Sequence, residues 1–270
     1  GYKEVCELLI EKGADVNAIM QNGWTALMLA ADGGYKEVCE LLIEKGADVN
    51  AVNESGLTSL MIIAKSPWFP GAWNGYNTCK LLIEKGADVN AVNESGLTAL
   101  IFALQNGNEE IFKLLIEKGA DVNATMQNGL TVLMYAVVNR HKEVCQLLID
   151  SGAEVNAVNE SGLTALIFAL QNRNGEIFKL LIEKGADVNA VNEDGRTVLM
   201  IIAKSPWFLG ARNGYDMCKL LIEKGADVNA ISPDGLTVLI FALQNGDEEI
   251  FKLLIEKGAD VNATMQNGLT

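Results

Sequence analysis

A six-residue motif recurs along the whole chain, and its spacing limits the possible folds more than any other feature. Gly-Ala-Asp-Val-Asn-Ala begins at residues 13, 46, 86, 119, 185, 225 and 258, and Gly-Ala-Glu-Val-Asn-Ala begins at 152. The motif returns every 33 residues, or every 40 residues where a segment is inserted. A fixed period of this length indicates a solenoid, in which each repeat buries its apolar face against its neighbours. Complete repeats occupy 20–52, 53–92, 93–125, 126–158, 159–191, 192–231 and 232–264, and residues 1–19 and 265–270 are partial repeats of a single array.

Each repeat carries the same local signals. Its fourth residue is a glycine such as Gly23, which suits a tight turn with positive φ. Thr25, two residues later, is placed to cap a short apolar helix at 26–31. A second amphipathic helix follows at 36–45, and Gly46 lies where a left-handed C-cap belongs. One turn and two helices per repeat predict an all-α repeat solenoid.

This arrangement resembles the ankyrin repeat, and the resemblance covers the whole chain. Ankyrin repeats usually carry Thr-Pro-Leu-His at the start of the first helix. Here the same place reads Thr-Ala-Leu-Met at 25–28 and Thr-Val-Leu-Ile at 237–240. The resemblance therefore implies a turn plus two antiparallel helices per repeat, with apolar contacts in place of the histidine hydrogen bonds between repeats.

Composition excludes several classes of protein. The net charge is −14, and the sequence has no run of Lys and Arg, which argues against nucleic acid and anionic membranes as partners. Apolar stretches such as 97–104 are too short to span a bilayer. The chain opens without Met or a signal pattern and is cut within a repeat at both ends, so we expect a fragment of a longer array. These features favour protein partners.

The sequence shows no pattern typical of catalysis, a cofactor or a metal site. The cysteines share one position of the second helix, where other repeats have Phe, so we expect reduced core thiols and an intracellular, cytoplasmic protein; they are Cys6, Cys39, Cys79, Cys145 and Cys218. His141 stands alone in a turn, where a structural role is more common than catalysis. The repeated Asp-Val-Asn lacks the Asp-x-Asp-x-Asp-Gly pattern of a calcium loop. We therefore expect a non-enzymatic protein without cofactor or metal.

Two repeats are interrupted by aromatic segments, KSPWFPGAWNGY at 65–76 and KSPWFLGARNGY at 204–215. Pro67 and Pro206 should end the first helix, and Gly75 and Gly214 should resume the normal turn, so the insertion is expected in the loop between the helices. The aromatic residues concerned are Trp68, Phe69, Trp73, Trp207 and Phe208. Either these rings cover the flank of the next repeat, or they remain accessible and bind a partner.

The two segments belong to a larger duplication. Residues 46–131 recur as 185–270 with few differences, most of them at the turn tips or at the insertion. Pairs such as Leu57/Arg196 and Thr78/Met217 are among them. Either exposed positions have drifted, or the two copies have been adapted to different contacts.

The resemblance to ankyrin repeats also implies that the turn tips and first helices line a concave groove for a protein partner. It places Trp24, Leu57 and Arg196 in the groove just after the turn glycine, and Lys65 and Lys204 near the end of the first helix. Packing between repeats is the alternative for the leucines in this row. Acidic residues rim the tips, so we expect a partner with apolar anchors and basic flanks.

The first functional hypothesis is a non-enzymatic scaffold or adaptor that binds proteins. The second is a structural array that stacks end to end or coats a cytoskeletal polymer. The third is the recognition arm of a larger enzyme whose catalytic domain lies outside this sequence. By the same resemblance, Asn50 and Asn90 match a position that asparaginyl hydroxylases modify in some ankyrin domains.

Overall fold

The computed structural model describes residues 3–66, 73–205 and 212–263. Two compact units divide the chain, residues 1–127 and 128–270, and each is described by itself. The first unit contains α1 (Lys3–Glu11), α2 (Ala26–Asp32), α3 (Lys36–Glu44), α4 (Ser59–Lys65), α5 (Trp73–Glu84), α6 (Ala99–Gln105) and α7 (Glu109–Glu117). The second contains α8 (Val132–Val138), α9 (Lys142–Asp150), α10 (Ala165–Gln171), α11 (Gly175–Glu183), α12 (Val198–Lys204), α13 (Arg212–Glu223), α14 (Val238–Asn245) and α15 (Glu248–Glu256).

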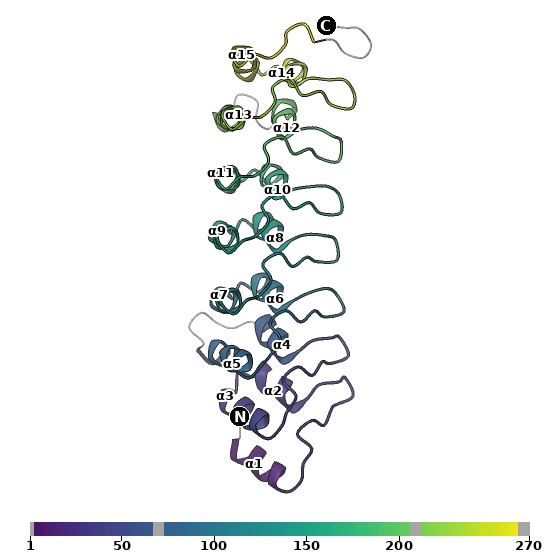
Figure 1. Cartoon of the computed structure of the whole chain (residues 1–270), viewed down its shortest axis with the longest axis vertical. Helices are drawn as coiled ribbons and strands as arrows, with labels where there is room; N and C mark the ends of the chain where they lie inside the picture. Colours follow the sequence, from purple (N-terminus) through teal and green to yellow (C-terminus); the bar gives the residue numbers. More distant parts are fainter. Residues whose placement is uncertain (1–2, 67–72, 206–211, 264–270) are drawn as a thin grey trace. The chain divides into compact units, whose positions relative to one another are not determined.

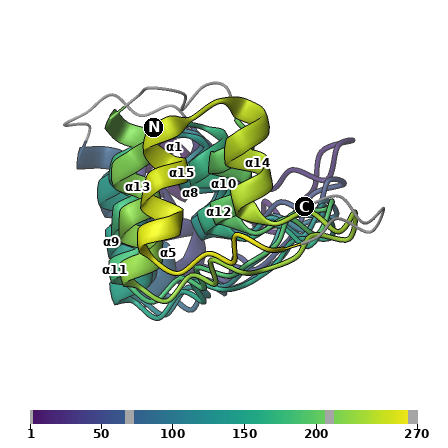
Figure 2. The ribbon, with the colours of Figure 1, turned by 90° about the horizontal axis from the view of Figure 1, so that it is seen from above.

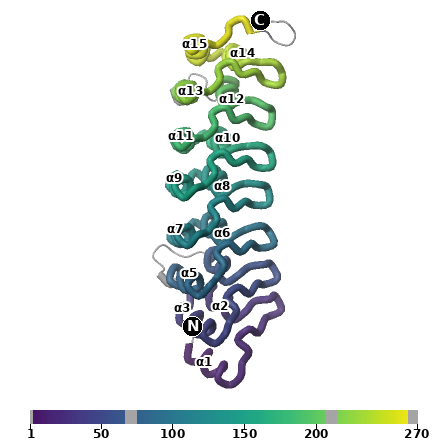
Figure 3. The backbone as a smooth tube through the Cα atoms, viewed as in Figure 1, coloured from purple at the N-terminus to yellow at the C-terminus, as the bar shows by residue number. Residues whose placement is uncertain are grey.

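Within each unit the repeats stack in register, as expected for an all-α repeat solenoid. In the first unit α2, α4 and α6 form a layer of first helices, and α3, α5 and α7 form a layer of second helices (Figure 1). In the second unit α14 and α15 show the same two layers, and the hairpin turns extend beyond the first helices (Figure 2). The tube in Figure 3 follows the path of repeats such as 93–125 and 159–191 from hairpin to first helix, interhelix turn and second helix.

A threonine hydroxyl begins every described first helix, as predicted. Thr25 Oγ1 accepts a hydrogen bond from the Met28 amide at 3.2 Å, and Thr131 Oγ1 accepts one from Met134 at 3.1 Å. The residue that receives this cap is apolar and buried, with Met28 and Ile101 both 0% exposed. Buried apolar side chains therefore stand where the ankyrin pattern has histidine.

Glycine fits two of the predicted turns for physical reasons. Gly46 has φ of 95° just after α3, so it ends the helix in the left-handed region. Gly56 has φ of 70°, and a Cβ atom there would lie 2.9 Å from the backbone nitrogen of Glu94. A larger residue at position 56 would strain the backbone and collide with the next repeat.

Asparagine side chains join successive repeats. Asn90 Nδ2 donates to the Gly119 carbonyl at 3.1 Å, and Asn90 Oδ1 accepts from the Asp121 amide at 2.8 Å. The same pair of bonds is made by Asn17, Asn50, Asn156, Asn189 and Asn229. Each amide uses both its donor and its acceptor, so it fixes how one repeat sits on the next.

The cores lie between the two layers of helices and between repeats. Leu82 and Leu221, which are equivalent in the duplicated block, are both 0% exposed. Cys39, Cys79, Cys145 and Cys218 are buried free thiols, and Phe112 and Phe178 are buried at the same position of the second helix. The predicted core position is confirmed, although Cys6 in α1 is only half-buried.

The boundary of the aromatic insertion was predicted incorrectly. The first helices end at Lys65 and Lys204 as expected, but Gly75 and Gly214 do not resume the normal turn. They lie inside α5 and α13, which have 12 residues where α3 has 9. The insertion frees the start of the second helix from the short turn, so the helix extends by three residues, each continuing its hydrogen-bond ladder. Trp73 is consequently the first residue of a helix and not part of the loop.

The short interhelix turns also need a left-handed residue. Gly34, Gly107 and Gly246 take this conformation with φ between 66° and 75°. In repeats 126–158 and 159–191 the same position is Arg140 with φ of 62° and Arg173 with φ of 54°. This conformation costs a non-glycine residue about 1 kcal/mol, so two arginines occupy sites whose backbone favours glycine.

Three pairs of differences between the block copies lie in the core and not at an exposed edge, namely Ser59/Val198, Thr78/Met217 and Ala99/Val238. Thr78 is 0% exposed and donates a hydrogen bond to the Gly34 carbonyl at 3.2 Å. Its counterpart Met217 is 1% exposed. The expectation that the copies differ mainly at exposed positions therefore fails here, because this position of the second helix is buried in other repeats too, as at Val38 and Ile111.

Removing core volume should destabilise both copies alike. We expect Leu82→Ala and Leu221→Ala each to lower the free energy of unfolding by about 2–5 kcal/mol, because each leaves a cavity between repeats. Urea unfolding measures the change. Leu243→Ala is the matched control, since Leu243 is 66% exposed, and it should change the free energy little. An unchanged midpoint for Leu82→Ala would contradict the packing described above.

The thiols should react in two classes. Burial raises the pKa of Cys39, Cys79 and Cys145 to about 12 and also raises that of Cys218, so few thiolates form at mildly alkaline pH. We expect iodoacetamide to label half-buried Cys6 first in the native protein, and all five cysteines after denaturation without reductant. Peptide mass spectrometry measures each site, and fewer than five labelled cysteines would refute the free-thiol assignment.

The asparagine bridges should contribute to stability through both ends of the amide. Asn90→Asp keeps the shape but places a carboxylate against the Gly119 carbonyl, and Asn90→Ala removes both bonds. We expect each variant to lower the free energy of unfolding by about 1–2 kcal/mol. Urea unfolding tests this against Asn106→Ala as control, since Asn106 bonds only its own helix at Phe102. A smaller loss at Asn90 than at Asn106 would contradict a bridging role.

Candidate functional site

The predicted site residues come from the turn tips and the first helices. Trp24 is half-buried in the turn before α2, where its amide donates to Asn22 Oδ1 at 3.3 Å. Leu57 is only 9% exposed, so it belongs to the packing between repeats, the alternative considered for this row. Trp24 therefore remains a candidate for partner contact in the first unit, and Leu57 does not.

Two equivalent lysines end their first helices beside an aromatic ring of the next repeat. Lys65 Nζ lies 5.8 Å from the centroid of Phe102, and Lys204 Nζ lies 5.8 Å from that of Phe241. Both lysines are exposed, whereas the rings are 5% and 1% exposed. A cation over a ring face is attracted to it by about 0.5–1 kcal/mol at an exposed site. Each ring therefore helps to hold an exposed positive charge on the first-helix layer.

Arg196 stands where the first copy of the block has Leu57. Its Nη1 lies 2.7 Å from Asp194 Oδ2, its Nη2 lies 3.5 Å from Asp234 Oδ2, and its guanidinium lies 5.6 Å from the Phe241 centroid. The Nε atom is buried without a hydrogen-bond partner. Arg196 is thus held between two carboxylates and a ring.

Three of the differences between the copies form this one ion-pair network. The first unit has Ser55, Leu57 and Ser95 where the second has Asp194, Arg196 and Asp234. A buried leucine was exchanged for an arginine together with two carboxylates that neutralise it. The Ser232 hydroxyl, the Asp234 backbone amide and the Arg196 guanidinium together hold the pKa of Asp234 below its usual range.

A small hollow lies beside Arg196 in the second unit. Its volume is about 250 Å³, and its lining combines positive, amide, hydroxyl and aliphatic groups. The lining residues are Asn192, Arg196, Ile201, Lys204 and Ser205. Two predicted site residues, Arg196 and Lys204, are therefore brought together at one place.

The hairpin tips expose a row of aliphatic side chains that sequence reasoning missed. In the first unit Ile19, Val52 and Val92 are 71%, 58% and 59% exposed. In the second unit Val158, Val191 and Ile231 are 60%, 45% and 69% exposed. We call these six residues the finger row. The signal was present in the sequence, since each follows the recurring Val-Asn-Ala directly.

In the second unit each finger-row residue pairs through its backbone with a threonine that caps a first helix. Val158, Val191 and Ile231 form antiparallel bridges with Thr164, Thr197 and Thr237. The threonines are buried and cap the first helices, whereas the residues bridged to them remain exposed. Acidic side chains flank the row and are exposed, as predicted: Glu54 and Glu94 in the first unit, and Glu160, Glu193, Asp194 and Asp234 in the second.

The remaining predicted site residues lie outside the described part of the chain. Trp68, Phe69, Trp207 and Phe208 are not described, and the side chain of Trp73 is not described either. Among residues 3–66, 73–205 and 212–263, no group of three His, Cys, Asp or Glu side chains is arranged to hold a metal ion. Over the same residues, no helix combines the length and apolar character needed to cross a membrane.

Comparison with known proteins agrees with the repeat architecture. A family model described as ankyrin repeats in three copies matches residues 1–91, 68–159, 152–206 and 192–265. No curated protein matches the chain. Since the family matches extend over nearly the whole sequence and the structure shows the turn-plus-two-helix repeat, the chain belongs to the ankyrin-repeat family.

Proposed function

We propose that this chain is a non-enzymatic scaffold or adaptor that holds a protein partner against its finger row and first helices. Ankyrin repeats generally mediate protein–protein interaction and are typically binding modules without enzymatic activity. In this chain the finger row and the first helices make the contact with the partner. It includes an intracellular, cytoplasmic location, where the buried cysteines remain reduced.

The observation that carries the proposal is the finger row. Large aliphatic side chains that are 45% to 71% exposed recur at the same position of successive repeats. Regularly spaced, exposed apolar groups of this kind can bind the apolar side chains of an extended segment of a partner protein. The flanking carboxylates favour a partner whose apolar anchors are followed by basic residues.

Lys65, Lys204, Trp24 and Arg196 would complete the surface toward the first helices. In the second unit the hollow of about 250 Å³ beside Arg196 and Lys204 could seat one side chain of the partner. Two carboxylates already neutralise the charge of Arg196. Arg196 therefore contributes to the lining of the hollow through its shape and hydrogen bonds more than through net charge. The proposal extends to Trp68, Phe69, Trp73, Trp207 and Phe208 on sequence grounds alone.

A self-stacking structural array is the second candidate. The observation that favours it is the exact repetition of second-helix sequences, such as those of α1 and α3, since matching repeats of two molecules can pack as neighbouring repeats of one chain do. Size-exclusion chromatography over a range of concentrations separates the two, since a scaffold remains a monomer and an array grows with concentration.

Polar substitution of the finger row should weaken partner binding without affecting the fold. We expect Val191→Ser combined with Ile231→Ser to reduce the recovery of bound proteins in affinity capture about tenfold or more, because exposed anchors are lost. Leu243→Ser is the control, since Leu243 is equally exposed but lies on α14 away from the hairpin. Unchanged recovery with an unchanged urea midpoint would refute finger-row docking.

The aromatic insertions need a separate test. Replacing Trp68, Phe69, Trp207 and Phe208 together by Ser should reduce capture while leaving the urea midpoint nearly unchanged, if the rings contact a partner. A loss of several kcal/mol of stability with unaltered capture would show that they pack against the repeats instead.

A further inference from the structure

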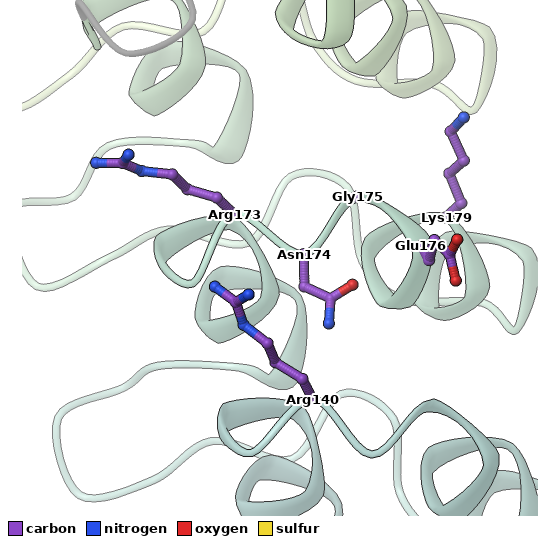
Figure 4. Close-up of a pocket in the computed structure, with 6 residues that line it drawn as sticks. All are labelled: Arg140, Arg173, Asn174, Gly175, Glu176 and Lys179. Atoms are coloured by element: carbon purple, nitrogen blue, oxygen red, sulfur yellow. The ribbon is translucent and has the colours of Figure 1, made fainter.

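A positive hollow lies at the interhelix turns of the second unit, far from the finger row along the repeat. Arg140 and Arg173 take the same position in two successive turns, and Lys179 lies one turn into α11. These three side chains line an open hollow of about 350 Å³ with Asn174, Gly175 and Glu176 (Figure 4). The chain as a whole carries a net charge of −14, so this cluster opposes the general character of the surface.

Repeat 93–125 provides an internal comparison because it is of the same type as repeat 159–191. It has Gly107 at the turn, and Glu109 at the start of its second helix. Lys113 Nζ lies 3.8 Å from Glu109 Oε2, so its charge is partly neutralised within the helix. The equivalent pair in repeat 232–264, Lys252 and Glu248, has the same contact at 3.5 Å.

Repeat 159–191 reverses this arrangement with two changes. Arg173 replaces the turn glycine, and Gly175 replaces the glutamate. Lys179 therefore has no carboxylate four residues before it, and the turn gains one positive charge and loses one negative charge relative to repeat 93–125. Gly175 also leaves the floor of the hollow without a side chain.

The geometry brings the charge of two repeats together. Arg140 Nη2 donates to the Asn172 carbonyl at 2.8 Å, which places its guanidinium beside the turn that carries Arg173. In Figure 4 the Arg140 side chain extends toward that turn, the Arg173 side chain extends away from Lys179, and Lys179 rises from α11 on the other side of Asn174. Glu176 Oε2 lies 3.1 Å from Lys142 Nζ, so the acidic residue of the lining is already paired.

The backbone conformation at positions 140 and 173 does not explain why arginine is found there. Both have positive φ, at a position where Gly34, Gly107 and Gly246 are found in other repeats. Glycine adopts this conformation more easily. The turn itself therefore does not call for arginine.

We propose that this hollow binds the phosphoryl group of a phosphoserine or phosphothreonine in a partner protein. Guanidinium groups match phosphate oxygens with paired hydrogen bonds, and a lysine adds charge without fixed direction. A phosphoryl group concentrates nearly two negative charges in a volume that one hollow accepts. An extended polyanion would instead meet exposed carboxylates such as Glu143 and Glu183 on the neighbouring helices.

This proposal is independent of the finger row. The interhelix turns lie at the opposite end of each first helix from the hairpins, about 10 Å away for a helix of seven residues. A partner could therefore occupy one surface without the other. Loss of binding at one leaves the other intact.

The test is a titration of the isotope-labelled full chain with N-acetyl-O-phosphoserine amide, followed by nuclear magnetic resonance. We expect saturable shifts of the Arg173–Glu176 amides with a dissociation constant on the order of millimolar, as suits a single small group. Arg173→Gly combined with Gly175→Glu gives this turn the residues of repeat 93–125 and should weaken binding about tenfold or more. Its urea midpoint should stay near that of the parent chain.

Further variants and probes keep the proposal falsifiable. Arg140→Asn, which also tolerates positive φ, should weaken binding if both repeats contribute. The proposal is overturned if no saturable shift occurs, or if both variants bind as the parent does. Equal affinity for N-acetyl-aspartate amide would exclude phosphoryl recognition, and tighter binding of inorganic phosphate or of an oligothymidylate would exclude a phosphoprotein partner.

Discussion

No repeat of this chain can be stable by itself, and the contacts between repeats carry the fold. Its first helices have seven or eight residues and most second helices have nine, which is too short for stability in isolation. Burial of residues such as Leu82 and Leu221 between repeats supplies the apolar driving force. The asparagine bridges then fix the stacking, because each amide must meet both a carbonyl and an amide of the next repeat. Turns and helix ends matter because they place these groups in register.

Much of the fold could be predicted because its signals are local and repeated. Thr25 and its equivalents cap helices through atoms three residues away, and Gly46 ends a helix through its own backbone. The start of α5 at Trp73 could not be predicted in this way, because helix extension depends on the room that an insertion gives. The burial of Leu57 was equally hidden, since it depends on the neighbouring repeat, whereas that of Thr78 follows from the buried apolar residues at the same position of other repeats, such as Ile111.

The candidate surfaces were predicted less completely for a related reason. Lys65, Lys204 and Arg196 were placed correctly on turns and first helices, but their rings and one of the two carboxylates, that of Asp234, come from the following repeat. The positive hollow escaped sequence reasoning altogether, because Arg140 and Arg173 are 33 positions apart and form no run of charge. A solenoid converts residues one period apart into neighbours, so its sites must be sought by comparing equivalent positions of successive repeats.

The similarity of the repeats has a consequence for assembly during folding. Repeat 93–125 packs on an aromatic-insertion repeat in the first unit, and repeat 159–191, which is of the same type, follows a repeat without that insertion in the second. One kind of packing face thus accepts two kinds of neighbour. Identical helices such as α7 and α15 can therefore compete for one docking position while the chain is incomplete. At high concentration, repeats of one molecule can likewise pack in the place of identical repeats of another molecule. The native contacts then form between two chains instead of within one.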